Sequence, residues 1–357
     1  MGECGIAATA LVGNNPRLPL PQNPLMETAP ATREHTWSRY WSTGVMHSCA
    51  GSYDATYSGA IGSFWRTAFL ALPQDARVLD LACGNGPLAH LLVTLPERSD
   101  LRCDAVDLAD IAPPWLADLA PEQRARVCFR GRCAVEQLPF PSESFQLVVS
   151  QWGLEYSDLD RSVPELLRVL APTGRVQLLL HHEDALPVRL AAHEIEHMDW
   201  LQATRGFMDA ATALLAPMAQ AGTAEGRARL AGDTDATAVR ERFNDLQAEL
   251  QARIDLGQCP DVLAEVRHRV SQVIGLTVQQ GEAAGRSAIT ALSQDLADAR
   301  LRLKELRDHA MDESKAAALA KRLTGSADYG LTPLVDRGQI LGWALTAEAG
   351  RGCGNLP

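Results

Sequence analysis

Short apolar runs recur along residues 77–182 and alternate with stretches of helical spacing. Four of these runs have the apolar centre expected of strands buried on both faces of a parallel sheet, and they cover residues 78–81, 101–106, 145–150 and 175–181. Turn-forming residues separate each strand from the helix that follows it. The repeated order of strand, turn and helix predicts an α/β fold in which helices cover a parallel sheet.

Residues 185–322 are rich in Ala, Leu, Glu, Gln and Arg and poor in strand signals, which predicts a block of helices. Apolar residues recur there at alternating steps of three and four, as in the a/d seam of a coiled coil, at Ile289, Leu292, Leu296, Ala299, Leu303, Leu306 and Ala310. An antiparallel hairpin of long helices, a homodimer interface, or a helix packed on its own domain would each produce this seam. Residues 323–357 regain strand-like character, so we expect the end of the chain to rejoin the sheet.

The first 70 residues divide into two parts. Residues 1–30 carry several prolines without sustained periodicity, which predicts a flexible tail, and Met26 offers an alternative start. The next segment concentrates aromatic side chains at helical spacing, namely Trp37, Tyr40, Trp41, Tyr53, Tyr57, Phe64 and Trp65. We expect this segment to form a capping layer or a lid over a substrate.

Composition and charge narrow the class of partner. The 357 residues favour one large domain with an added segment, or two domains. A net charge of −11 disfavours a nucleic-acid partner and favours a small molecule. No run approaches the roughly 18 to 20 uncharged apolar residues of a membrane span, and the start lacks a signal-peptide pattern. Because the eight cysteines form no C-x-x-C pair, as is typical of reduced thiols, we expect a cytoplasmic protein.

The strongest motif is the apolar strand, acidic residue and glycine turn of residues 78–89, followed by a helix that starts at Pro87. The glycines allow a tight turn and let a ligand approach the main chain, while the helix amino end offers N–H groups to a carboxylate or phosphate. This arrangement predicts a nucleotide-like ligand. The spacing Gly84-x-Gly86-x-x-Ala89 also fits a loose dinucleotide fingerprint, so an NAD(P)-dependent oxidoreductase is one alternative.

Two acidic residues favour a different ligand. Asp80 lies four places before the first glycine, where a carboxylate suits an ammonium group better than a pyrophosphate. Asp107 follows the glycine turn at about the distance expected for a ribose-binding carboxylate, and it can accept hydrogen bonds from both ribose hydroxyls. The pair therefore predicts a nucleoside that carries an amine.

The motifs of this chain resemble those of a known family. Residues 78–89 look like motif I of the class I S-adenosylmethionine-dependent methyltransferases, and Asp107 looks like their motif II acid. Residues 135–150 resemble the Leu-Pro-Phe-Pro stretch of the menaquinone- and ubiquinone-type small-molecule branch (methyltransferase type 11). Residues 165–175 are similar to the helix, Pro-x-Gly turn and fifth strand that follow in that family.

The resemblance implies a Rossmann-like seven-stranded sheet with helices on both faces and a long, coiled-coil-like helical insertion. The core would span residues 31–184, with closing strands in 323–357, and the insertion would occupy 185–322. It implies S-adenosylmethionine as cofactor and methyl transfer to an O, N or C atom of a small organic acceptor. It also implies cofactor contacts at Tyr40, Asp80, Ala82, Gly84, Gly86, Asp107, Leu108, Val135, Glu136, Gln151 and Trp152.

Two positions depart from the family pattern. An acidic residue that meets the adenine amino group is replaced by residues 132–135, so backbone groups or Glu136 would take that role. The Asp after Ser-Phe is Gln146, which still accepts a hydrogen bond. A non-catalytic coiled-coil interaction protein with a degenerate core is therefore a second alternative.

Methyl transfer is an in-line displacement that needs mainly proximity, with a base only where the acceptor loses a proton. His181 and His182 at the end of the fifth strand are the candidate bases, and structural hydrogen bonding is their alternative role. Trp152 would cover the cofactor or pack in the core. Tyr40 would contact the methionine end or belong to a helix packed on the sheet.

A second motif, His193-Glu194-Ile195-Glu196-His197, matches the zinc-binding pattern H-E-x-x-H. A metalloprotease would also need a third ligand and a cleft-forming strand. Because the motif follows a complete methyltransferase-like core, we expect a solvated helix face there and no metal.

Overall fold

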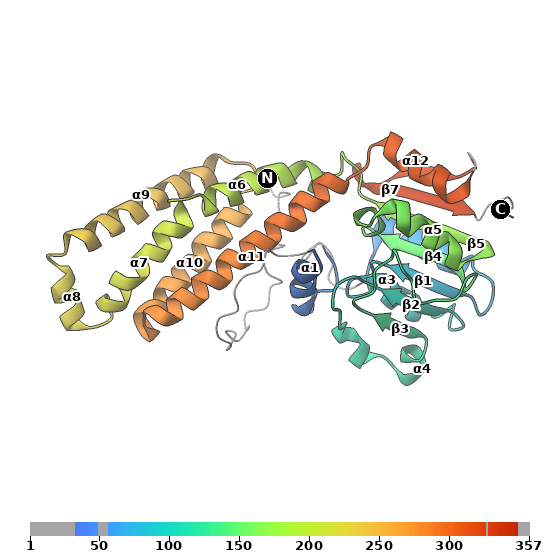
Figure 1. Cartoon of the computed structure of the whole chain (residues 1–357), viewed down its shortest axis with the longest axis horizontal. Helices are drawn as coiled ribbons and strands as arrows, with labels where there is room; N and C mark the ends of the chain where they lie inside the picture. The colour runs from blue at the N-terminus through green and yellow to red at the C-terminus, as the bar shows by residue number, and fades with distance from the viewer. Residues whose placement is uncertain (1–32, 49–55, 326–327, 349–357) are drawn as a thin grey trace. The chain divides into compact units, whose positions relative to one another are not determined.

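A computed structural model describes residues 33–48, 56–325 and 328–348 (Figure 1). The predicted tail at residues 1–30 and Tyr53 of the aromatic segment lie outside the described residues. The chain divides into two compact units. A helical unit comprises Leu190–Lys304, and a sheet unit comprises Pro30–Arg189 together with Glu305–Pro357.

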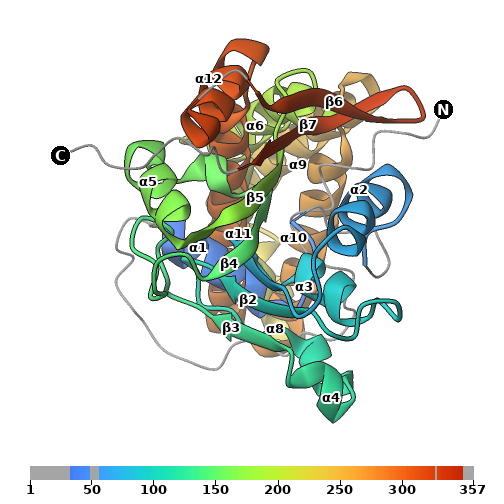
Figure 2. The same cartoon turned by 90° about the vertical axis from the view of Figure 1, so that its right-hand side faces the viewer.

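The described part of the sheet unit forms one seven-stranded sheet in the order β3-β2-β1-β4-β5-β7-β6 (Figure 2). Its strands are β1 (Arg77–Leu81), β2 (Arg102–Val106), β3 (Val127–Arg130), β4 (Phe145–Gln151), β5 (Leu170–Leu180), β6 (Gly330–Asp336) and β7 (Gln339–Glu348). The first five strands in this order are parallel, β7 runs antiparallel to β5, and β6 runs antiparallel to β7. The predicted Rossmann-like sheet with a closing antiparallel pair is confirmed.

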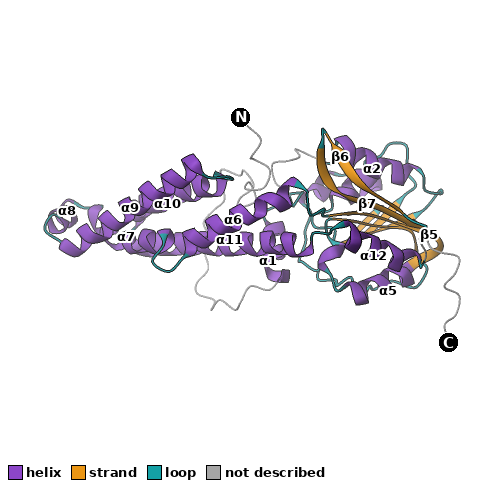
Figure 3. Cartoon of the chain, turned by 90° about the horizontal axis from the view of Figure 1, so that it is seen from above, coloured by secondary structure: helices purple, strands orange, loops and turns teal. Residues whose placement is uncertain are grey.

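Helices cover both faces of this sheet, as Figure 3 shows for α2 on one side and α5 and α12 on the other. The helices of the sheet unit are α1 (Arg33–Ser42), α2 (Gly59–Leu70), α3 (Pro87–Val93), α4 (Pro121–Arg124), α5 (Leu159–Val169) and α12 (Glu313–Thr324), with short 3-10 helices η2 (Pro114–Asp118) and η3 (Leu154–Tyr156). Successive strand residues alternate between the two cores, because side chains point to opposite faces of a strand. Thus Leu147 and Val149 pack toward α2 and α3, and Val148 packs toward α5 and α12.

The strand order reverses between β1 and β4, since β2 and β3 extend to one side and β5 to the other. In open α/β sheets a ligand binds outside the carboxyl ends of the strands at such a switch point. The segments that follow β1, β2 and β4 are the glycine turn, Asp107 and residues 152–157. The topology therefore brings the predicted motifs to one edge of the sheet.

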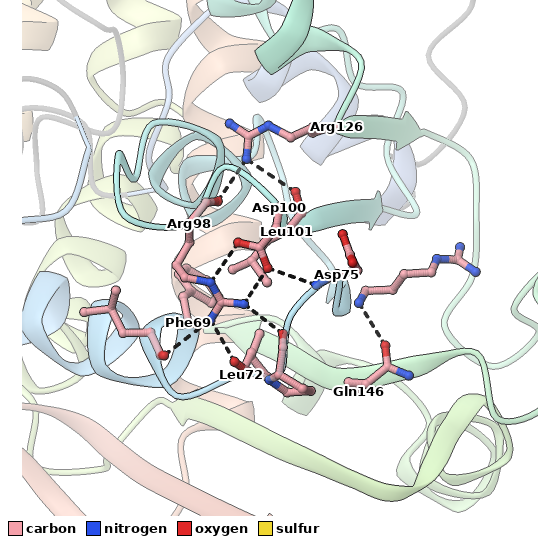
Figure 4. A network of polar contacts seen from close by, with 11 residues as sticks. Phe69, Leu72, Asp75, Arg98, Asp100, Leu101, Arg126 and Gln146 are labelled. Atoms are coloured by element: carbon pink, nitrogen blue, oxygen red, sulfur yellow. Dashed lines mark hydrogen bonds and ion pairs between the residues drawn. The ribbon is translucent and has the colours of Figure 1, made fainter.

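Partly buried polar contacts fix the opposite ends of the strands (Figure 4). The Arg98 guanidinium donates to the carbonyls of Phe69 and Leu72 at 2.9 Å and forms a two-pronged ion pair with Asp100. This pairing lowers the pKa of the Asp100 carboxyl. Gln146 accepts from the backbone N–H that begins β1, at 2.9 Å, so the predicted acceptor role of this residue is structural.

The strand β5 begins earlier than predicted. Leu170 pairs with Phe145, but Arg175 pairs with Leu147, so the register shifts by several residues between the two pairs. The predicted Pro-x-Gly turn, Pro172 to Gly174, falls inside this irregular stretch. The turn interrupts the ladder without ending the strand.

The helical unit is built from α6 (Leu186–Gln202), α7 (Phe207–Ala221), α8 (Ala224–Leu230), α9 (Thr234–Leu256), α10 (Asp261–Gln280) and α11 (Glu282–His309). The first turn of α6 and the last turn of α11 belong to the sheet unit. Inside the helical unit Phe207 stacks on Phe243, with ring centroids 5.7 Å apart, and α7 packs against α9 and α10. The predicted helical addition to the α/β fold is confirmed.

The predicted a/d seam of α11 is buried within the single chain. All of its residues except the half-buried Leu306 are buried. At its end, Leu306 and Ala310 pack with Ala185 and Val188. Because the chain's own side chains cover it, the seam is not available as a homodimer interface.

The boundaries between the sheet unit and the helical unit differ from the predicted bounds of the insertion, residues 185 and 322. Side chains of α12, including Ala316 and Leu319, pack in the same core as β4 and β5. Periodicity predicts that a segment is helical but not what the helix packs on, which explains the difference. In the described part of the chain, no helix is long and apolar enough to cross a membrane.

Candidate functional site

A pocket with an empty volume of about 870 Å³, including space open to solvent, lies at the predicted edge of the sheet. Side chains from α1, the glycine turn, the ends of β2 and β4, and η3 line it. The pocket combines aromatic walls with the Asp107 carboxylate, which is the usual character of a small-molecule site.

Most of the predicted cofactor residues line this pocket: Ala82, Gly84, Asp107, Leu108, Val135, Glu136, Gln151 and Trp152. Tyr40, Asp80 and Gly86, although described, are not part of its lining. The structure thus brings together residues from separate motifs and places three predicted residues behind the wall.

Asp107 holds the glycine turn against the end of β2. Its Oδ2 accepts from the Gly84 N–H at 2.7 Å, and its Oδ1 accepts from the Ala109 N–H at 2.8 Å. Burial raises the pKa of this carboxyl to about 6, while the two backbone hydrogen bonds lower it. Since each carboxylate oxygen has a second lone pair, Asp107 can still accept from ribose hydroxyls.

Asp80 is a buried carboxylate behind the glycine turn. Its Oδ2 has no hydrogen-bond partner among the described residues. Burial, and then the charge of Asp107, raise the pKa of Asp80 well above its usual value. A cation bound in the pocket would relieve this repulsion, so Asp80 suits an ammonium group through its charge, without the direct contact implied by the family resemblance.

The two glycines of the turn face different neighbours. Gly84 has φ +53°, and a Cβ on it would lie 2.4 Å from the Trp41 ring. Gly86 has φ +72°, and a Cβ on it would lie 2.3 Å from the Phe129 ring on β3. Gly84 is therefore the glycine that the pocket requires, whereas Gly86 allows the turn to close against the sheet.

Trp41 belongs to α1, which is fixed to the glycine turn by Asn85. The Asn85 amide donates to the carbonyls of Trp41 (2.9 Å) and Val45 (2.7 Å). Trp37 stacks on Trp41, with centroids 5.8 Å apart. The predicted role of α1 as a cover over the ligand site fits this arrangement.

Tyr40, on the same helix, has a structural role. Its hydroxyl is shared between the carbonyls of His47 (3.0 Å) and Ser48 (3.1 Å). These contacts order the segment after α1, and Tyr40 itself is not among the residues that line the pocket. The predicted contact of Tyr40 with the methionine end of a cofactor is not supported by this geometry.

Two polar groups next to the pocket are unsatisfied. The Gln151 carbonyl oxygen accepts from the Trp65 indole N–H. The Gln151 amide nitrogen and the Trp152 indole nitrogen are buried without a partner among the described residues. Unsatisfied buried donors are costly, so a ligand that accepts from them would stabilise this wall.

Two residues of the pocket lining also have a strained backbone. Ala82 and Trp152 both have side chains and yet adopt the left-handed conformation, at φ +52° and +53°. Such strain is typical of functional sites. Glu136, which also lines the pocket, accepts from the Asp158 N–H at 2.9 Å and so joins its loop to the start of α5.

The two candidate bases have different environments. The His181 N–H donates to Glu155 Oε1 at 2.9 Å, and the His181 ring Nδ1 lies 2.8 Å from the same oxygen. Because a carboxylate oxygen only accepts, Nδ1 is the donor in this contact, and in the neutral ring Nε2 then keeps the lone pair. His182 instead stacks on Trp343, with centroids 4.4 Å apart, and its Nδ1 accepts from the Asp184 N–H. His182 is therefore structural.

His181 is not among the described residues that line the pocket, but the two aromatic residues that enclose its ring are. Trp152 stacks on it and Tyr156 meets it edge-on, each with centroids 5.7 Å apart. The Glu155 side chain is fully buried. Glu155 was not predicted as a site residue, because nothing in the local sequence pairs it with a strand-end histidine.

The H-E-x-x-H motif lies on α6 and does not form the expected solvated face. Glu194 and His197 are buried, and His197 Nε2 lies 2.7 Å from the carbonyl of Gln258. Burial raises the pKa of Glu194 to about 7. Among the described residues, no group of three or more His, Cys, Asp or Glu side chains is arranged to hold a metal ion.

The comparisons with known proteins concern the sheet unit. Residues 78–174 match a family model described as a methyltransferase domain. The chain is 36% identical over 150 residues to the ubiquinone/menaquinone biosynthesis C-methyltransferase UbiE of Xanthomonas campestris pv. campestris, covering 38% of this chain and 56% of the relative. It is 40% identical over 119 residues to the demethylmenaquinone methyltransferase of Thermus thermophilus, covering 32% of this chain and 51% of the relative.

Among solved structures, one similar chain is the 1,6-didemethyltoxoflavin-N1-methyltransferase of Burkholderia thailandensis with bound S-adenosylhomocysteine, at 23% identity and a TM-score of 0.33. The similarity covers 44% of this chain and 68% of that chain. The chain spans about half the length of the curated relatives it matches. Residues 78–174 of the sheet unit are thus similar to a methyltransferase domain, and the relatives that share this similarity are themselves methyltransferases.

Proposed function

We propose that the protein transfers a methyl group from S-adenosylmethionine to a small organic acceptor. The observation that carries this proposal is the position of Asp107, whose carboxylate is held by the Gly84 and Ala109 amides at the wall of the pocket. The similar methyltransferases, which belong to ubiquinone and menaquinone biosynthesis or act on demethylmenaquinone, support a small organic acceptor.

The residues of the pocket fit this cofactor, which supplies an electrophilic methyl group when bound. Asp107 would accept from the ribose hydroxyls. Asp80, through its charge, would favour the ammonium group of the methionine end. Val135 and Glu136, which line the same pocket, would meet the adenine edge. Trp41 and Trp152 would exclude water from the reacting atoms.

His181 is the proposed base where the acceptor must lose a proton. Glu155 holds the ring through Nδ1 and leaves the Nε2 lone pair to take that proton. The Trp152 and Tyr156 rings fix the orientation of the imidazole. Glu155→Gln should therefore reduce turnover of an acceptor that needs deprotonation more than it reduces cofactor binding.

Titration of the purified protein with S-adenosylhomocysteine and, separately, with NADH tests the proposed function. We expect calorimetry to give a micromolar dissociation constant for S-adenosylhomocysteine and no measurable binding of NADH. Micromolar NADH binding without S-adenosylhomocysteine binding would favour the oxidoreductase alternative. Binding of neither ligand would favour the non-catalytic alternative.

A further inference from the structure

We infer that Glu305 is a positioning residue of the pocket, because its carboxylate holds α1 in place at the pocket wall. This inference rests on the proposed function, since the pocket that Glu305 would position is the proposed cofactor site. Glu305 lies in the last turns of α11, far along the chain from α1, and belongs to the same compact unit as the pocket.

The Glu305 carboxylate binds two side chains of α1. Its Oε1 accepts from Arg33 Nε at 2.6 Å, and its Oε2 accepts from Trp37 Nε1 at 3.4 Å. Arg33 and Trp37 both line the pocket. The Glu305 side chain is only 12% exposed, so water competes weakly for this carboxylate.

Arg33 extends the same contact to two further groups. Its Nη1 donates to the carbonyl of Tyr156, another pocket residue. Its Nη2 lies 3.2 Å from His309 Nε2, and because arginine has only donors, His309 accepts there. Burial, and then the charge of Arg33, lower the pKa of His309, which keeps the ring neutral.

One carboxylate thus joins three pieces of the site: α1, the η3 loop and the end of α11. Without its charge, the Arg33 guanidinium would remain partly buried and unpaired beside the pocket, which is costly. The wall formed by Arg33, Trp37 and Tyr156 would then be free to move away from the ligand. Glu305 acts on the cofactor through Arg33 and Trp37, and it is a positioning residue rather than a catalytic one.

The decisive variant is Glu305→Gln, which keeps the size of the side chain and removes its charge. We expect S-adenosylhomocysteine to dissociate about tenfold faster from this variant than from the wild type, with little change in the association rate. Stopped-flow measurement of intrinsic tryptophan fluorescence reports both rates, because Trp37 and Trp41 line the pocket.

A matched control lies on the same helix. Glu282 pairs with Arg286 at 2.6 Å on the exposed first turns of α11, so Glu282→Gln removes an ion pair without touching the pocket. We expect wild-type rates for this control. Equal dissociation rates for Glu305→Gln, Glu282→Gln and the wild type would overturn the inference.

Hydrogen exchange separates this inference from the proposed function. In the ligand-free full-length protein, the backbone amides of Arg33–Ser42 should exchange faster in Glu305→Gln than in the wild type or the control. If the wild type fails to bind S-adenosylhomocysteine, the proposed function falls, and exchange still decides whether Glu305 holds α1. Unchanged exchange overturns the inference.

A second variant serves if Glu305→Gln does not fold, as judged by circular dichroism. Arg33→Lys keeps the charge but loses the planar fork that reaches Glu305, Tyr156 and His309 together. It should give the same faster exchange of α1 at a smaller magnitude. Wild-type exchange in this variant would contradict the role assigned to the network.

Discussion

Asp107 must be ionised to accept hydrogen bonds from two backbone amides and a ligand, and its pKa is raised to about 6 by burial. Protonation would therefore remove the binding-competent form below that pH. We expect the affinity for S-adenosylhomocysteine to be constant above about pH 7 and to fall about tenfold for each pH unit below 6. Calorimetric titrations between pH 5 and pH 8, in steps of about half a pH unit, measure this dependence.

The raised pKa of Asp107 affects the stability of the folded protein in the opposite direction to ligand binding. Because the folded-state pKa of Asp107 is above the unfolded value of about 3.9, this group stabilises the folded state most below that value, and the contribution is lost as pH rises through 6. Tight ligand binding and maximal intrinsic stability at this residue thus require different pH ranges.

Replacement of the carboxylate tests the same site at neutral pH. In Asp107→Asn, the amide group would turn a donor toward one of the Gly84 and Ala109 N–H groups. We expect affinity for S-adenosylhomocysteine to fall about 10- to 100-fold and its pH dependence near 6 to disappear. Wild-type affinity in Asp107→Asn would show that the ribose is bound elsewhere.

Gly84 permits the close approach of α1, so a methyl group there should disturb the cover of the pocket. In Gly84→Ala the Cβ would meet the Trp41 ring at 2.4 Å, on a backbone with φ +53°. We expect the free energy of unfolding to fall by about 1–3 kcal/mol in chemical denaturation. The control is Gly275→Ala, where no atom lies within 4 Å of the added Cβ and a helix gains stability.

At the scale of elements, the seam of α11 is a core feature. Leu296 is fully buried, so Leu296→Ala should lower the free energy of unfolding of the helical unit by about 2–5 kcal/mol. Leu256 is 88% exposed at the end of α9, and Leu256→Ala should change the free energy of unfolding by less than about 0.5 kcal/mol. Denaturant titrations followed by circular dichroism compare the two. Similar effects would mean that the seam does not stabilise the unit.

Periodicity predicted the central strands well because burial on both faces makes them apolar throughout. It missed β3, since Val127–Arg130 is a short edge strand with alternating exposed positions. It also grouped α12 with the insertion, because a helix has the same periodicity whatever it packs on. Packing partners, unlike elements, are determined by distant residues.

The difference between features set by neighbouring residues and features set by distant residues also applies to the candidate site. The glycine turn and Asp107 were predictable because their geometry depends on adjacent residues and on the strand order. Arg33, Glu155 and Glu305 were not, since each acts through a partner that is remote in sequence or unmarked by any motif. The structural role of Tyr40 was also not predictable, because helical spacing does not reveal that its hydroxyl binds the carbonyls of His47 and Ser48.

At the scale of the whole molecule, the sheet unit contains a complete core and both ends of the inserted segment. Val188 and Leu306 meet in one small cluster, so the chain leaves and re-enters this unit at neighbouring points. Replacing Leu190–Lys304 by a short Gly/Ser linker should therefore leave a folded protein. We expect it to bind S-adenosylhomocysteine within about tenfold of the full chain, a difference of about 1.4 kcal/mol.

Circular dichroism and calorimetry of that variant, beside the full chain, provide the measurement. The variant keeps Glu305, so the contact with α1 is retained. A soluble, folded protein that no longer binds the ligand would show that the helical unit contributes to the site. An unfolded product would show that the sheet unit depends on the insertion for its stability.

The neighbouring ends of α6 and α11 also affect how the sheet can form. β7 pairs with β5 through contacts such as Arg175 with Glu348, which join residues on either side of the whole helical unit. Closing so long a loop costs conformational entropy that grows with the number of disordered residues between the partners. When the helices fold first, the contact of Val188 with Leu306 draws the flanking segments together, and the loop is effectively a short one. With that order of folding, we expect the insertion to lower the kinetic barrier that its own length would impose on completing the sheet.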